Sequence, residues 1–105
     1  MVYVMSQYDR PTDARQWHEY NGQVRGWIAQ LLALPGATSF MAYRSADGSS
    51  PNTTTMLEFG TVDEARAAIS SEAMRSILQG LKAVGSVPRV LIVERSPFTP
   101  EPLKP

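Results

Sequence analysis

The sequence contains no cysteine and a single histidine, and these two scarcities exclude several kinds of site. Disulfide bridges, iron–sulfur clusters and thiolate zinc sites all require cysteine. A metal site built from several imidazoles needs more histidine than His18 provides. We therefore expect no bound metal and no cofactor. The lack of cysteine also permits, without requiring, a cytoplasmic location.

A surplus of positive charge and long apolar runs are also lacking. Ten lysine and arginine residues balance ten aspartate and glutamate residues, which disfavours binding to nucleic acid or to an anionic membrane. The most apolar stretch, residues 27–34, includes Gln30 and is far shorter than the roughly twenty residues of a membrane span. Residues 1–6 have no basic residue ahead of their apolar stretch, so they do not match a signal peptide. We expect a cytoplasmic protein with no nucleic-acid or membrane partner.

The length and composition of the chain are those of a single ordinary globular domain. The chain has 105 residues, of which 43% are hydrophobic. Runs of β-branched and aromatic residues predict strands. The predicted strands are 2–8, 38–44, 52–59 and 89–94.

Apolar residues that recur at spacings of three and four predict two helical regions between these strands. The first runs from a cap at Thr12 or Asp13 to about residue 34. The second begins at a capping box over residues 61–64 and runs to residue 85. It is broken near 70–72, where one of two serines caps the second segment.

The element order β-α-β-β-α-β predicts a ferredoxin-like α+β fold, with both helices on one face of a four-stranded antiparallel sheet. The strands nevertheless carry large apolar residues on both sides, such as Val4 against Met5 and Phe40 against Met41. An open face of that composition is larger than monomers usually tolerate. We therefore expect a homodimer in which two copies pack sheet to sheet about a two-fold axis.

The domain is expected to span residues 1–95. Residues 96–105 contain four prolines and cannot form a helix or a central strand. They predict a C-terminal arm that is either disordered or laid over a neighbouring surface through Phe98 and Leu103.

Residues 2–95 resemble the dimeric α/β-barrel superfamily, which includes antibiotic-biosynthesis monooxygenases and EthD-like proteins. One marker is 34–37 (Leu-Pro-Gly-Ala), between the first helix and the second strand. Another is 58–65 (Glu-Phe-Gly-Thr-Val-Asp-Glu-Ala), followed by 70–74 (Ser-Ser-Glu-Ala-Met). The resemblance implies a cavity between helices and sheet rather than one particular reaction. Haem-degrading members place a histidine on the second helix, and that region contains none here.

His18 and Gln7 are the candidate catalytic residues. Histidine is the residue type that titrates near neutral pH, so His18 is either a general base or a solvated residue on the flank of its helix. Gln7 lies at the end of the first strand, where several proteins of the superfamily that the chain resembles place a polar amide in the cavity. The other interpretation is that backbone groups satisfy its amide.

Four residues of the first helix are candidates for ligand binding. Trp17, Tyr20 and Trp27 lie on its inward stripe and Asn21 lies at the edge of that stripe. They form either a core that packs on the sheet or the wall of a pocket, since indole and phenol rings also carry a polar group.

Together these features predict a homodimeric α/β-barrel protein that binds an aromatic or apolar organic compound. The resemblance implies a cofactor-independent monooxygenase or an EthD-like catabolic protein. Proton abstraction from an acidic phenol or carbonyl compound is the reaction that needs the fewest catalytic groups, namely one base and one hydrogen-bond donor. The alternative is a non-catalytic ligand-sensing or assembly domain of the same fold.

Overall fold

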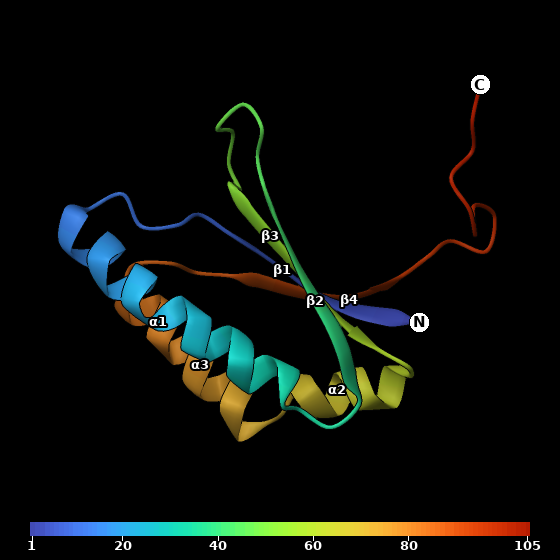
Figure 1. Cartoon of the computed structure of the whole chain (residues 1–105), viewed down its shortest axis with the longest axis horizontal. Coiled ribbons are helices and arrows are strands. Elements are labelled where there is room, and N and C mark those ends of the chain that lie inside the picture. Colours follow the sequence, from blue (N-terminus) through green and yellow to red (C-terminus); the bar gives the residue numbers. More distant parts are fainter.

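A computed structural model describes the whole chain, residues 1–105, as one sheet with the helices packed against one of its faces (Figure 1). The elements along the chain are β1 (Val2–Tyr8), α1 (Ala14–Leu32), β2 (Ala37–Arg44), β3 (Thr53–Phe59), α2 (Val62–Ile69), α3 (Glu72–Ala83) and β4 (Arg89–Glu94). This order confirms the predicted ferredoxin-like α+β fold. The predicted break in the second helix is also confirmed, because α2 and α3 are separate helices.

The sheet has four antiparallel strands in the order β2-β3-β1-β4, so β1 is a central strand. Ser6 of β1 lies opposite Thr55 of β3 on one side and Val90 of β4 on the other. Directly opposed residues share a face, so rows of side chains cross the sheet. The even-numbered residues of β1 and the odd-numbered residues of β3 face the helices, where Val4 and Leu57 are buried.

The helices begin where the sequence provides capping oxygens. Asp13 caps α1 by accepting a backbone N–H of the first turn at 3.0 Å. Thr61 and Glu64 form the predicted capping box at the start of α2. Ser71, rather than Ser70, caps α3.

The junction at 34–37 requires its glycine. Gly36 has a φ of +83°, which favours glycine, and a Cβ there would overlap the carboxylate of Glu64. The same carboxylate accepts the backbone N–H of Thr61 at 3.1 Å. The junction between α1 and β2 is therefore packed on the first turn of α2.

The hydrophobic core lies entirely between the helices and the sheet. One cluster joins the centre of the sheet to α2 and the start of α3: Val2, Val4, Leu57, Phe59, Ala65, Ala68 and Met74. A second cluster joins α1 to α3 and the end of β1: Tyr8, Tyr20, Trp27, Ile77, Leu81 and Val84.

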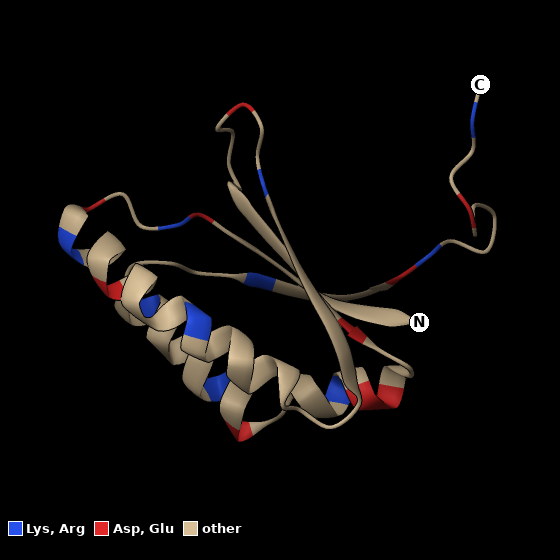
Figure 2. Ribbon diagram, in the orientation of Figure 1, with Lys and Arg blue, Asp and Glu red and all other residues tan.

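No helix covers the opposite face of the sheet, which we call the open face (Figure 1). Its central row crosses all four strands and consists of Met41, Met56, Met5 and Leu91. Charged residues lie on the helices, in the loops and toward the strand ends, and the middle of the sheet has none (Figure 2). The second apolar face that the strand patterns predict is therefore confirmed along this central row, whereas the rows on either side also carry polar residues such as Glu58 and Gln7.

Residues 96–105 contain no helix or strand and extend away from the rest of the chain (Figure 1). Phe98 and Leu103 in this arm are 91% and 80% exposed. None of the helices has both the length and the apolar character that crossing a bilayer demands.

Candidate functional site

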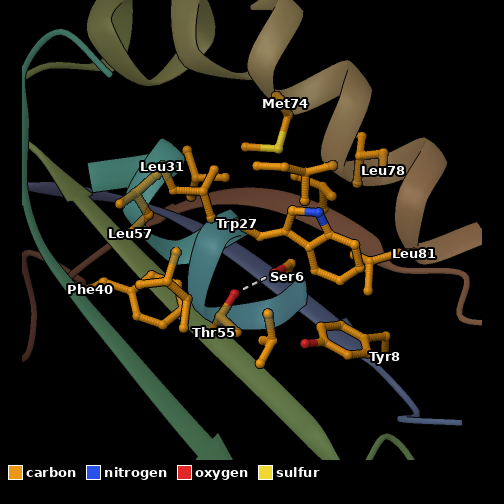
Figure 3. Close-up of a pocket in the computed structure, with 15 residues that line it drawn as sticks. Ser6, Tyr8, Trp27, Leu31, Phe40, Thr55, Leu57, Met74, Leu78 and Leu81 are labelled. Carbon is orange, nitrogen blue, oxygen red and sulfur yellow. Dashed lines mark hydrogen bonds between the residues drawn. The ribbon is translucent and has the colours of Figure 1, made fainter. Parts of the chain in front are cut away.

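A cavity of about 50 Å³, partly open to solvent, lies between α1, α3 and the helix-covered face of the sheet (Figure 3). Thirteen of its 15 lining residues are hydrophobic, and none is charged. The lining residues are Val24, Trp27, Ile28 and Leu31 of α1, Met74, Ile77, Leu78 and Leu81 of α3, and Val4, Ser6, Tyr8, Phe40, Thr55, Leu57 and Val90 of the sheet.

Two hydroxyl groups occupy the sheet side of this cavity. Ser6 and Thr55 are cross-strand neighbours on β1 and β3, and their side-chain oxygens are hydrogen-bonded to each other (Figure 3). They are the two lining residues that are not hydrophobic. The sheet therefore contributes one small polar spot to an otherwise apolar wall.

Tyr8 adds a third hydroxyl at the end of β1. Its oxygen lies 2.7 Å from the hydroxyl oxygen of Tyr20, and both side chains are buried. Burial, with the hydrogen bond to Tyr20 second, raises the pKa of Tyr8 far above its usual value. Tyr8 consequently stays a neutral phenol at physiological pH.

A run of aromatic rings connects the cavity to the surface of α1. Tyr20 packs edge-on against Trp27, with ring centroids 6.0 Å apart, and stacks on Trp17 at 5.8 Å with an interplanar angle of 24°. The guanidinium of Arg10 lies 5.9 Å from the centroid of the Trp17 ring. Trp17, at 40% exposure, is the outer end of this run.

The structure brings together three of the four predicted ligand-binding residues. Trp27 lines the cavity, Tyr20 is buried behind Tyr8, and Trp17 stacks on Tyr20 at the surface. Asn21 is exposed and does not line the cavity.

The two predicted catalytic residues are not brought together. His18 is exposed on α1 and does not line the cavity. Gln7 lies between Ser6 and Tyr8, both of which face the cavity, so its side chain points to the open face. A catalytic role for either residue stays a prediction, and the geometry of this cavity does not support it.

The polar residues that do reach the cavity, Ser6, Tyr8 and Thr55, were not among the predicted site residues. The signal that identifies them is their position in the strand: Ser6 and Tyr8 continue the alternation of Val2 and Val4, the buried side of β1. Once that side is known to face the helices, the register places Thr55 beside Ser6.

No protein-family model matches the chain, and no curated protein matches it. Solved structures do match over most of its length. An ethyl tert-butyl ether degradation (EthD) family protein from Bacillus halodurans is 15% identical, with a TM-score of 0.69 over 91% of this chain and 99% of that one. SnoaB, a cofactor-independent oxygenase from Streptomyces nogalater, is 17% identical, with a TM-score of 0.70 over 95% and 97% of the two chains.

HapK from Hahella chejuensis is also similar, at 14% identity and a TM-score of 0.66 over 92% of this chain and 94% of that one. At such identities the likeness concerns the fold, which hosts more than one function. The chain therefore has the same ferredoxin-like fold as these structures.

Proposed function

We propose that the chain is a homodimeric small-molecule-binding protein that holds an aromatic or apolar organic compound between its helices and its sheet. The observation that carries this proposal is the cavity, with 13 hydrophobic residues among the 15 that line it. Ligand sites of this kind combine an apolar wall with a few polar groups that orient the ligand. Burial of the ligand's apolar surface supplies the driving force.

The size of the cavity favours a compound with a single ring at its inner end. Its volume of about 50 Å³ is smaller than the roughly 150 Å³ of an engineered cavity that binds benzene. Because the cavity is partly open to solvent, a ring that packs against Trp27 can extend into the cavity opening. The remaining atoms of a larger ligand then lie outside the cavity.

The catalytic form of the proposal is cofactor-independent oxygenation of the bound compound, and the likeness to SnoaB supports it. The cavity offers hydroxyl groups and an apolar wall, but no carboxylate, imidazole or amine. The proton abstraction predicted for His18 therefore has no corresponding base in the cavity. The alternative, a ligand-sensing or assembly domain, needs only the binding that the cavity supports.

The homodimer part of the proposal is supported by the open face. Met41 and Tyr43 are 55% and 58% exposed there, and the methionine-rich central row runs from Met41 across β3 and β1 to β4. Exposed apolar patches of this kind mark interaction surfaces, and a second copy of the same patch covers it in a two-fold arrangement. The predicted cytoplasmic location stays a prediction from the sequence.

Titration with isopropylbenzene, followed by ¹H–¹⁵N NMR, tests the binding site. We expect a saturable shift of the Trp27 indole N–H signal and a smaller response at Trp17, which does not line the cavity. Val24→Phe fills the cavity from α1 and should weaken binding at least about tenfold. Val62→Phe, a matched change on the exposed start of α2, should leave it unchanged. An unshifted Trp27 signal, or equal binding by both variants, would contradict the proposal.

A further inference from the structure

Two pairs of hydroxyl groups lie at or beside the cavity. In each pair, one hydroxyl hydrogen has no acceptor in the protein. The side-chain oxygens of Ser6 and Thr55 bond to each other, and so do those of Tyr8 and Tyr20. None of these four oxygens has another hydrogen-bond partner in the structure. A hydroxyl group carries one hydrogen, so one member of each pair donates and the hydrogen of the other remains free.

The Ser6–Thr55 pair is the one placed to meet a ligand. Both of its residues line the cavity on the sheet side (Figure 3), whereas Tyr20 is bonded to Tyr8 and is not a lining residue. The rest of the wall is apolar apart from the Tyr8 hydroxyl, which is bonded to Tyr20, and neither Ser6 nor Thr55 donates to it. A ligand that displaces water from this pair must bring an acceptor of its own, because a buried donor without a partner is unfavourable.

The charge of the lining restricts the ligand further. No acidic or basic side chain lines the cavity, and the one phenol in it, that of Tyr8, is neutral at physiological pH, since its ordinary pKa is already about 10 and burial raises it further. A carboxylate, phosphate or ammonium group would therefore be buried without a counter-charge, which is strongly unfavourable. The cavity thus selects for uncharged compounds.

We infer that the cavity takes a neutral compound carrying an acceptor oxygen, such as an aromatic ketone, whose carbonyl accepts the free hydrogen of the Ser6–Thr55 pair. This inference rests on the proposed function, because it names the class of ligand for the same cavity. The apolar wall holds the ring, and the hydroxyl pair fixes which way the ring points.

Three probes with the same number of non-hydrogen atoms separate the contributions of the apolar wall, the acceptor oxygen and the ligand's charge: isopropylbenzene, acetophenone and benzoate. The variant is Ser6→Ala combined with Thr55→Val, because either hydroxyl alone still supplies a donor once the other is removed. We expect the double variant to bind acetophenone about tenfold more weakly, the loss of one hydrogen bond, and isopropylbenzene at least as well as before. Benzoate should show no saturable binding to either protein.

Thr54→Val is the matched control, since Thr54 adjoins Thr55 on β3 but points to the open face. It should leave all three probes unaffected. Retained binding of isopropylbenzene shows that the double variant still folds around its cavity.

The outcomes distinguish this inference from the proposed function. If both neutral probes bind and the double variant leaves acetophenone unaffected, the inference is overturned and the binding site stands. Binding of benzoate at the affinity of acetophenone overturns it as well. If neither neutral probe binds, the proposed function fails and the inference fails with it.

Discussion

Trp27 reaches the cavity because α3 presents a glycine beneath its ring. A Cβ at Gly80 would lie 2.7 Å from Cζ2 and 3.3 Å from Cε2 of the indole. Nothing lies within 4 Å of a Cβ built at Gly26, which is exposed on α1. We expect Gly80→Ala to lower the free energy of unfolding by about 1 kcal/mol, because the clash outweighs the higher helix propensity of alanine. Gly26→Ala should raise it by roughly 0.5–1 kcal/mol.

Urea unfolding of the two variants and the wild type measures this difference. The substitution is the same in both, and only the contact with Trp27 differs. If Gly80→Ala stabilises the protein as much as Gly26→Ala does, the ring moves aside at no cost and is not held by α3.

Residue patterns predict the helix side of the site better than the strand side. Tyr20 and Trp27 are identifiable because a helix on a sheet buries one stripe of its surface, and both lie on that stripe. In β1, large residues occupy both sides, so the alternation does not reveal which side faces the helices. Gln7 was therefore a reasonable candidate from the sequence, whereas its neighbour Ser6 is the residue that lines the cavity.

At the level of elements, the fold was predictable because each boundary has a local chemical cause. Capping oxygens begin the helices, and Gly36, at a positive φ, follows the end of α1. Long-range contacts were not predictable in this way. The contact of Gly36 with Glu64 joins residues that are distant in the sequence, and no local pattern encodes it.

A second long-range contact joins two connections at the other end of the sheet. Asp9, in the β1–α1 connection, accepts the Asn52 backbone N–H at 2.8 Å and the Ser50 hydroxyl. These hydrogen bonds hold the pKa of Asp9 below its ordinary value of 3.8, and the bond from Ser50 has the larger effect. A carboxylate whose pKa is lowered by folding stabilises the protein above its unfolded-state pKa and loses that contribution as the pH falls through its folded-state pKa.

Asp9→Asn should therefore make stability less dependent on pH in acid. We expect the urea midpoint of the wild type to fall more than that of the variant between about pH 5 and pH 2. Glu101→Gln, which removes a carboxylate from the arm, should keep the wild-type dependence. Parallel curves for the wild type and Asp9→Asn would mean that the bonds to Ser50 and Asn52 contribute nothing to stability.

For the whole molecule, the two faces of the same sheet account for the cavity and for the homodimer that we propose. One face supplies Ser6 and Thr55 to the ligand site, and the other carries the row of Met5, Met41 and Met56. Because the helices cover only the first face, folding buries the apolar side chains of that face and leaves those of the open face partly exposed. The homodimer that we propose would cover them, and the formal charge of zero means that two copies would meet without net repulsion.

Met41→Asp tests this association. Met41 is 55% exposed in the single chain, so an aspartate there costs little in folding, but in a two-fold interface it buries two like charges. Sedimentation should give the wild type twice the chain mass of 11.6 kDa and the variant that mass itself, with an unchanged circular dichroism spectrum. Leu32→Asp, at a residue that is 44% exposed at the end of α1 and away from the open face, should stay dimeric. A wild type that sediments at 11.6 kDa at high concentration would refute the sheet-to-sheet dimer and leave the cavity as the site of a monomer.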